Sequence, residues 1–122
     1  FWASQKVLLT GHTGFKGSWL ALWLEKLGAE VAGYALAPDH APDLHGLLQP
    51  FARHSSTLAD LACARSLKSC VDAFGPTVAI HMAAQPLVRR SYADPTGTFA
   101  TNVMGTINLL EALRQSPGLR SI

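Results

Sequence analysis

The sequence predicts an α/β fold with a doubly wound parallel sheet, and two observations carry that prediction. Short apolar runs typical of buried strands alternate along the whole chain with longer amphipathic segments typical of helices. Three glycines, Gly11, Gly14 and Gly17, lie between the first strand-like run and the first helix-like segment. The chain of 122 residues is 48 % hydrophobic and 15 % charged, which suits one globular domain with a buried core.

The first strand is expected at residues 6–10, where the run KVLLT ends at a glycine. A helix is expected over residues 15–27, followed by Gly28 as its C-terminal stop. One broad apolar stripe of that helix, which we expect to be core, consists of Trp19, Leu20, Trp23, Leu24 and Leu27. The second strand is expected at residues 30–36.

Residues 37–56 contain three prolines and little periodicity, so we expect a long loop with one helical turn at residues 44–48. A weak third strand is expected at residues 56–58. A helix should follow over residues 60–74, ended by Gly75. Its apolar face consists of Leu61, Ala64, Leu67, Val71 and Phe74.

The fourth strand is expected at residues 77–82, and the longest helix over residues 94–115, with Asp94 as N-cap and Pro95 at its first position. One side of that helix, expected to be core, consists of Phe99, Val103, Ile107, Leu110 and Leu113. A turn at residues 116–118 leads into what looks like the start of a fifth strand. We therefore expect these residues to be part of a longer domain, truncated near the start of the fifth strand.

Charge and composition argue against several classes of partner. The net charge of +2 comes from 10 basic and 8 acidic residues without a Lys/Arg-rich run, so we expect no nucleic-acid partner. No apolar run reaches membrane-spanning length and no signal peptide is recognisable, so we expect no membrane partner and a cytoplasmic location. Cys63 and Cys70, seven apart on one predicted helix, are expected to be buried free thiols. We expect no metal, because the histidines at 40, 45 and 54 lack ligand spacing.

The glycine cluster has a physical role at a strand–helix junction. In such motifs the first glycine makes a tight turn, the second lets a pyrophosphate approach the backbone, and the third lets the helix pack close to the strand. The pyrophosphate then lies at the positive end of the helix dipole. The P-loop pattern G-x-x-x-x-G-K-S/T fails, because Lys16 and Gly17 stand in reversed order, and G-x-G-x-x-G fails because Thr13 replaces a glycine. The spacing T-G-x-x-G-x-x-G remains, with a purely structural turn as the alternative.

The residues at the end of the second strand indicate whether NAD or NADP is the cofactor. An acidic residue there binds the ribose diol of NAD, whereas an arginine accommodates the additional phosphate of NADP. After Leu36 the chain has no acidic residue until Asp39 and no basic residue until Arg53. The absence of arginine favours NAD, and the absence of a well-placed acid predicts a weak hold on the ribose.

Several longer motifs together resemble the extended short-chain dehydrogenase/reductase family, whose cofactor domain has the Rossmann fold. They are TGHTGFKG at residues 10–17, ADL at 59–61, HMAAQPLVRRSY at 81–92 and TNVMGTINLLEALR at 101–114. Within that family, GHTGFKGSWL and HMAAQPLVR look most like the branch of 4,6-dehydratases that act on CDP-glucose. The resemblance covers nearly the whole chain, with residues 37–56 as its least constrained part.

The resemblance implies NAD as cofactor and assigns the residues around it. The pyrophosphate would be held by the loop that comprises Gly11, His12, Thr13, Gly14, Phe15, Lys16 and Gly17. The adenine would meet Asp60 and Leu61, and the nicotinamide ribose would meet Ala83, Ala84 and Gln85, with Thr101 facing the cofactor. The nucleotide-sugar substrate, CDP-glucose, would be bordered by Gln85, Arg89 and Ser91. The resemblance also implies a homo-oligomer in the full-length form.

The family's reaction oxidises C4 of the hexose, removes water across C5 and C6 and returns the hydride to C6, giving CDP-4-keto-6-deoxyglucose. Its base is a Tyr-x-x-x-Lys pair, but here Tyr34 is followed by Pro38 and Tyr92 by Thr96. We therefore assign no catalytic residue within this chain, a lyase activity to its parent protein, and no activity to these residues alone. Two alternatives stay open: a stand-alone nucleotide-binding module without catalysis, and a fragment of an NAD-dependent sugar-nucleotide epimerase or reductase.

Overall fold

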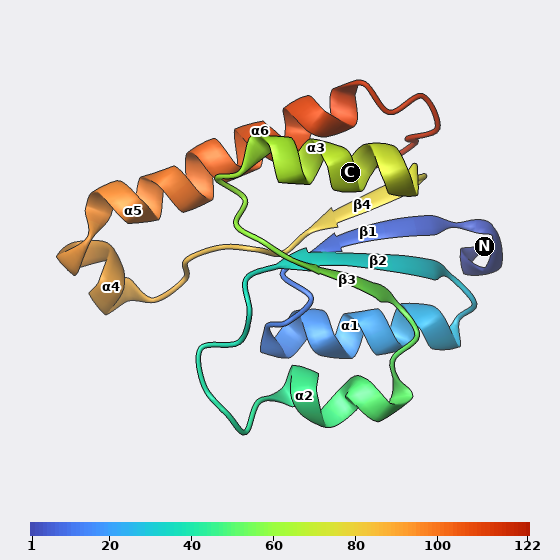
Figure 1. The fold of residues 1–122 in the computed structure, drawn as a ribbon, viewed down its shortest axis with the longest axis horizontal. Coiled ribbons are helices and arrows are strands. Elements are labelled where there is room, and N and C mark those ends of the chain that lie inside the picture. Colours follow the sequence, from blue (N-terminus) through green and yellow to red (C-terminus); the bar gives the residue numbers. More distant parts are fainter.

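A parallel sheet of four strands forms the centre of the computed structural model, which describes all residues 1–122 (Figure 1). The order of the strands across the sheet is β3-β2-β1-β4. Their bounds are Lys6–Thr10 for β1, Glu30–Ala35 for β2, Ser55–Leu58 for β3 and Val78–His81 for β4. Each strand lies within two residues of its predicted range, so the four predicted strands are confirmed.

The chain winds outward from β1 in two directions, as the doubly wound prediction requires. From β1 it crosses to β2 and then β3 on one side, and β4 pairs with the opposite edge of β1. Leu8 in the middle of β1 is in register with Ala32 of β2 and Ala79 of β4. Beyond β4, Ser121 forms an isolated parallel bridge to Val78, at the place where the start of a fifth strand was expected.

On one face of the sheet lie α1 (Phe15–Lys26) and α2 (Leu44–Leu48), which continues into the short helix η2 (Gln49–Phe51) (Figure 1). The long loop with one helical turn is thereby confirmed. The core on this face is small and consists of Val7, Leu9, Ala21, Leu24, Ala29 and Val31. The positive φ of Gly28, +89°, ends α1 as predicted.

The predicted core stripe of α1 is wrong for most of its members. Trp19, Trp23 and Leu27 are 49 %, 65 % and 45 % exposed. The buried side of α1 consists instead of Gly17, Ser18, Ala21 and Leu24. Gly17 lies against the backbone of Gly11, and this close approach turns the small side chains toward the sheet and the tryptophans outward.

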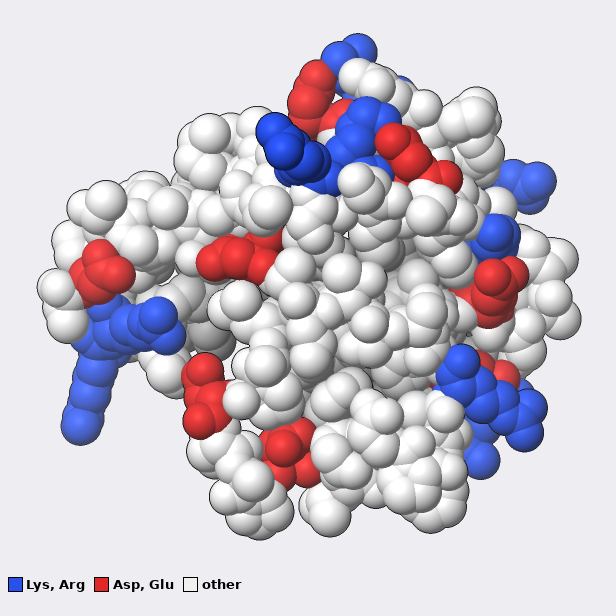
Figure 2. Space-filling view, in the orientation of Figure 1, with Lys and Arg blue, Asp and Glu red and all other residues white.

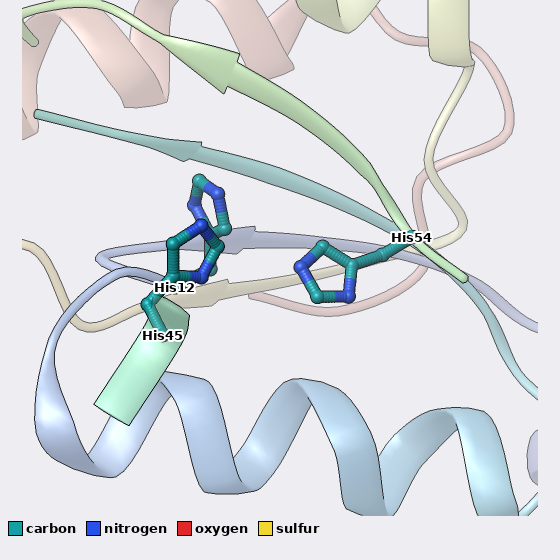
Figure 3. Close-up of side chains that lie close together, drawn as sticks. All are labelled: His12, His45 and His54. Carbon is teal, nitrogen blue, oxygen red and sulfur yellow. The ribbon is translucent and has the colours of Figure 1, made fainter. Parts of the chain in front are cut away.

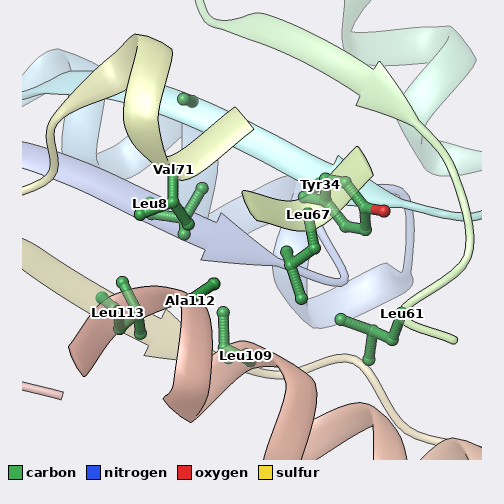
Figure 4. Packing of buried hydrophobic residues seen from close by; sticks show 10 residues of the cluster. Leu8, Tyr34, Leu61, Leu67, Val71, Leu109, Ala112 and Leu113 are labelled. Carbon is green, nitrogen blue, oxygen red and sulfur yellow. The ribbon is translucent and has the colours of Figure 1, made fainter. Parts of the chain in front are cut away.

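The opposite face carries α3 (Ala64–Phe74) and α6 (Gly105–Arg114), which pack against each other and the sheet (Figures 1 and 4). The larger core cluster lies here, and Leu8, Tyr34, Leu67 and Leu109 are at most 1 % exposed. The helix predicted from residue 60 begins only at Ala64. The residues before it form a turn in which the Asp60 carboxylate accepts a hydrogen bond from the Ala62 N–H.

The long predicted helix of residues 94–115 is divided into α5 (Pro95–Phe99), one π-helical turn η3 (Ala100–Met104) and α6. Asp94 caps it as predicted, with its carboxylate accepting from the Gly97 N–H at 2.8 Å. The expected core line is wrong except for Leu113: Phe99, Val103, Ile107 and Leu110 are exposed by 45–67 %. The buried residues are Gly105, Leu109, Ala112 and Leu113. A π turn has a wider repeat than an α turn, which rotates the faces on either side of it.

Two short helices were not predicted: η1 (Trp2–Ser4) and α4 (Val88–Ala93). Both cysteines are free, but Cys63 is exposed and Cys70 half-buried, so the prediction that both are buried is wrong. No helix is long and apolar enough to cross a membrane. On the face seen in Figure 2, basic side chains lie in several separate places near the edge and form no continuous basic patch, while acidic side chains also lie left of and below the centre.

Candidate functional site

A cavity of about 860 Å³ opens where the strands reach their carboxyl ends. Its walls are the loops that follow β1, β2, β3 and β4, together with Thr101 of η3. Because the chain leaves β1 toward β2 but returns to β4 on the other side of β1, this edge contains the topological switch point of the sheet. Ligands of open α/β sheets bind at such points.

The glycine loop forms one wall of this cavity, and its three glycines differ in what surrounds them. Gly11 has φ +77°, and a Cβ there would stand 2.8 Å from the backbone nitrogen of Ala83. A Cβ on Gly17 would overlap the carbonyl oxygen of Gly11. A Cβ on Gly14 would meet only that same oxygen, at 3.3 Å. The fold therefore requires Gly11 and Gly17, whereas the bare backbone of Gly14 is left facing open space.

The start of α1 is suited to an anion. Gly14 is its N-cap, no side chain caps it, and its first turn contains no acidic residue. The first N–H groups of a helix have no partner inside the helix and carry its positive dipole end. Lys16 is the one basic side chain among the residues that line the cavity. This end of the cavity can therefore hold a phosphate group through backbone N–H donors, with a cation beside them.

The loop after β2 forms the neighbouring wall. Residues 35–40 all line the cavity, and they include Asp39 but no lysine or arginine. The Thr13 hydroxyl donates to the carbonyl oxygen of Leu36 at 2.8 Å, which ties the glycine loop to this wall. The wall thus contains no lysine or arginine that could pair with a second phosphate.

The predicted adenine-side and ribose-side residues also lie at the cavity. Asp60, Leu61, Ala83, Ala84 and Thr101 line it. Side chains of β1 and β2 hold two of these residues in position through hydrogen bonds to their backbone. The buried Tyr34 hydroxyl donates to the Asp60 carbonyl oxygen at 2.9 Å, and the Ala83 N–H donates to Thr10 Oγ1 at 3.2 Å.

Four predicted site residues lie elsewhere. His12 is fully buried beneath the loop, and its Nε2 lies 2.7 Å from Ser56 Oγ. Gln85 uses its backbone N–H to bond Asn102 Oδ1 and its side-chain amide to bond Thr98 Oγ1. Arg89 and Ser91 belong to α4, which does not line the cavity. The structure thus brings eleven of the fifteen predicted residues (Gly11, Thr13, Gly14, Phe15, Lys16, Gly17, Asp60, Leu61, Ala83, Ala84 and Thr101) to one place.

His81 at the end of β4 is held by two hydroxyls. Thr10 Oγ1 accepts from the backbone N–H groups of Met82 and Ala83, so its own proton is free to go to His81 Nδ1, 2.6 Å away. His81 Nε2 lies 2.9 Å from Thr106 Oγ1, which in turn donates to the Asn102 carbonyl oxygen. This network fits a neutral imidazole with its proton on Nε2. Burial lowers the pKa of His81, in agreement with the neutral form.

The structure brings together a second group of residues, which no sequence motif indicated. His45 and His54 lie beside His12, with ligand atoms of the three imidazoles all within 4.8 Å of one another. Along the chain His45 and His54 lack ligand spacing, but the fold brings both of them to His12. Burial, followed by electrostatic repulsion from the neighbouring imidazoles of His54 and His45, lowers the pKa of His12 to about 4, against a smaller opposing effect of the Tyr34 backbone. Spacing along the chain could not reveal the group, because only the fold joins residue 12 to residues 45 and 54.

Known proteins resemble this chain in sequence and in fold. The family model described as GDP-mannose 4,6 dehydratase matches residues 8–121. CDP-glucose 4,6-dehydratase of Salmonella typhimurium is 44 % identical over 122 residues, which is 100 % of this chain and 34 % of that protein. UDP-glucose 4-epimerase of Mycolicibacterium smegmatis is 36 % identical, over 97 % of this chain and 37 % of that protein.

Among solved structures, the Thermus thermophilus UDP-glucose 4-epimerase complex with NAD is similar at a TM-score of 0.78 and 32 % identity, covering 93 % of this chain and 36 % of that one. The Brucella ovis UDP-glucose 4-epimerase in complex with NAD has a TM-score of 0.80 at 26 % identity, covering 97 % of this chain and 34 % of that one. The chain therefore spans about a third of the length of these relatives. The similarity of the structures confirms the predicted Rossmann-like α/β fold.

Proposed function

Since the chain belongs to the family that the GDP-mannose 4,6-dehydratase model describes, we propose that it is the NAD-binding N-terminal portion of a sugar-nucleotide 4,6-dehydratase. One observation carries the cofactor part of this proposal: the open backbone of Gly14 and the uncapped start of α1 face a cavity at the switch point of the sheet. Residues 1–122 are then part of a Rossmann dinucleotide-binding domain.

NAD fits the residues that line the cavity. The N–H groups at the start of α1 and Lys16 would hold its pyrophosphate. Asp60 and Leu61 would border the adenine, and Ala83, Ala84 and Thr101 would border the nicotinamide ribose. When bound, NAD supplies a reversible hydride acceptor for the sugar. The role of this chain is to bind and orient it.

We assign CDP-glucose as the substrate because the 44 % identical relative is a CDP-glucose 4,6-dehydratase. Gln85, Arg89 and Ser91, which follow β4 and lie outside the NAD cavity, would border the sugar nucleotide. We further assign a homo-oligomer in the cytoplasm, and the two free cysteines agree with a reducing compartment.

The proton-transfer groups of the reaction are assigned to the part of the relatives that these residues do not span. Neither tyrosine of the chain is followed by lysine four residues later. Tyr34 is fully buried, and its hydroxyl is engaged by the Asp60 carbonyl oxygen. Residues 1–122 alone should therefore bind NAD but leave CDP-glucose unchanged.

The test of this proposal is an isotope experiment with the full-length protein, in which a deuterium label at C4 of the substrate's hexose is followed into the product. CDP-glucose that carries deuterium at C4 should give a 4-keto-6-deoxy product with deuterium at C6 and no net NADH. UDP-glucose 4-epimerase is the second candidate, because relatives of that name share 36 % and 32 % identity with this chain. A product that keeps its C6 hydroxyl would move the assignment to an epimerase, and accumulation of NADH would move it to a dehydrogenase.

A further inference from the structure

Three imidazoles from separate segments meet beneath the glycine loop (Figure 3). His12 follows β1, His45 lies in α2, and His54 immediately precedes β3. The ring centroids of His12 lie 5.2 Å from His45 and 5.5 Å from His54. His12 is 0 % exposed, His45 is 9 % exposed, and the side chain of His54 is 5 % exposed. All three histidine side chains are thus largely shielded from solvent.

Each imidazole has one nitrogen held by a neighbour outside the group. His12 Nε2 lies 2.7 Å from Ser56 Oγ, and His54 Nδ1 lies 2.7 Å from Glu25 Oε1. His45 Nε2 lies 2.9 Å from the side-chain amide of Gln49, which can present either its nitrogen or its oxygen. Such outer contacts fix the orientation and tautomer of a histidine and leave its second nitrogen to bind something else.

The second nitrogens of two of these rings have no partner at all. His12 Nδ1 and His54 Nε2 are buried and make no hydrogen bond. A buried polar atom without a partner is unfavourable by about 1–3 kcal/mol. Two such atoms directed into one group of histidines indicate a missing ligand that accepts lone pairs. The three histidines make no hydrogen bond to one another, so they do not satisfy each other.

We propose that His12, His45 and His54 form a binding site for Zn²⁺. Imidazole nitrogens are preferred zinc ligands, and three of them with a water complete a tetrahedral site. Nitrogens bound to one zinc ion would stand about 3.3 Å apart. The ligand atoms of the three imidazoles lie within 4.8 Å of one another, so binding would draw the farthest of them closer by about 1.5 Å. The buried Glu25 carboxylate would compensate the charge and orient His54, as a carboxylate does behind many zinc-bound histidines.

The position of this site gives the ion a structural role. None of the three histidines lines the large cavity, so an ion there would not touch a dinucleotide bound in it. It would instead join the glycine loop to α2 and to the start of β3. The segment between β2 and α2 forms one wall of the cavity, so the ion would hold that wall in place. A second cavity of about 430 Å³ reaches the group on one side, where Glu25, Arg53 and His54 line it.

The test is a calorimetric titration of the metal-stripped protein with Zn²⁺ alone. The wild type should bind one ion per chain. His54→Ala and His45→Ala should each weaken binding by about 100-fold or more, and Glu25→Gln by about 10-fold, as expected for a ligand and for its outer partner. His40→Ala is the matched control, because His40 lies in the same loop but outside the group, and it should bind Zn²⁺ as the wild type does.

Two further measurements separate the site from casual binding and from misfolding. Circular dichroism verifies that each variant is folded before it is titrated. Saturating Zn²⁺ should raise the melting temperature of the wild type and of His40→Ala by about 5 °C or more, but not that of His54→Ala. Co²⁺ in place of Zn²⁺ should give the visible spectrum of a four-coordinate site. Equal Zn²⁺ affinity in the wild type and in a folded His45→Ala/His54→Ala double variant, or no binding by the wild type, would overturn the proposal.

Discussion

At the scale of single residues, two glycines of the same loop should have different roles: Gly14 in ligand binding and Gly17 in folding. Replacing Gly14 with valine should abolish NAD binding, because the branched side chain would project where the pyrophosphate must approach. The protein should stay folded, since Gly14 has an extended backbone with φ −74° and ψ 165° that valine adopts readily. The expected loss in the free energy of unfolding is about 1 kcal/mol. Calorimetric titration with NAD and a thermal melt measure the two effects.

Gly17→Val is the matched contrast within the same loop. Its Cβ would overlap the Gly11 carbonyl oxygen, so this variant should lose the fold and not the ligand site alone. Normal NAD affinity in folded Gly14→Val would contradict the assignment of the loop. The spacing of Gly14 and Gly17 was informative in the sequence because their contacts with Gly11 are local in the chain, whereas the approach of Gly11 to Ala83 is not.

His81 supplies a pH dependence whose sign follows from its environment. Burial lowers its pKa below the ordinary value of 6.5, so the unfolded chain takes up a proton that the folded chain resists. The stabilisation of the folded chain by neutral His81 is complete above the pKa that His81 has in the unfolded chain. It is lost as the pH falls below about 6.5. Protonation of Nδ1 would also end the bond donated by Thr10. The groups that bond the ring, Thr10 on β1 and Thr106 on α6, do not titrate in this range.

We therefore expect the free energy of unfolding to fall between pH 7.5 and 5 more steeply in the wild type than in His81→Gln. Other histidines with lowered pKa contribute to both proteins and cancel in the difference. At pH 7.5 the variant should be less stable by about 1–3 kcal/mol, for two lost hydrogen bonds. Urea unfolding in the presence of a chelator measures both quantities, and parallel pH profiles would show that His81 is not the titrating group.

At the scale of helices and strands, α1 shows where sequence periodicity misleads. Leu24 is 2 % exposed, whereas its neighbour Trp23 is 65 % exposed. Leu24→Ala should lower the free energy of unfolding by about 2–5 kcal/mol, because it leaves a cavity against β1. Trp23→Ala should change it by less than about 1 kcal/mol. Denaturant unfolding of the two variants measures these changes. An equal loss in the free energy of unfolding would mean that the side of α1 that carries Trp23 is also buried.

The end of β2 sets the choice between cofactors. The wall formed by residues 35–40 has no lysine or arginine to pair with the 2′-phosphate of NADP, and it contains Asp39. NAD should bind at least about 10-fold more tightly than NADP, since a favourable charged contact is worth about 1.4 kcal/mol or more. Leu36→Asp or Ala37→Asp should tighten NAD binding by supplying a carboxylate to the ribose. Fluorescence titrations with both dinucleotides decide this, and tighter binding of NADP would contradict it.

The existence of these elements was predictable, and so was the buried side of α3, where Leu67 and Val71 are at most 1 % exposed, but the buried sides of α1 and α6 were not. β1 and β2 are continuous apolar runs bounded by glycine or polar residues, so the strands could be found from local patterns. The buried side of α1 depends on how closely Gly17 approaches Gly11, and that of α6 depends on a π turn before it. Both are properties of packing in three dimensions, which periodicity does not encode.

At the scale of the whole molecule, the order of the strands was expected from the doubly wound fold that the glycine motif and the alternation of strands and helices indicate. That order places four loops at one edge of the sheet, so most residues of the cavity could be named from sequence. The histidine group could not, since residues 12, 45 and 54 are brought together by the packing of α2 against α1.

The central claim is that NAD occupies the cavity at the carboxyl ends of the strands. Hydrogen–deuterium exchange, measured by mass spectrometry with and without saturating NAD, tests it most directly because it reports every loop at once. NAD should slow exchange in peptides that contain residues 11–17, 35–40, 59–61 and 82–84, while α4 should change least. Gly14→Val should show no such protection at the same concentration. Protection confined to other parts of the chain, or none at saturation, would contradict the account.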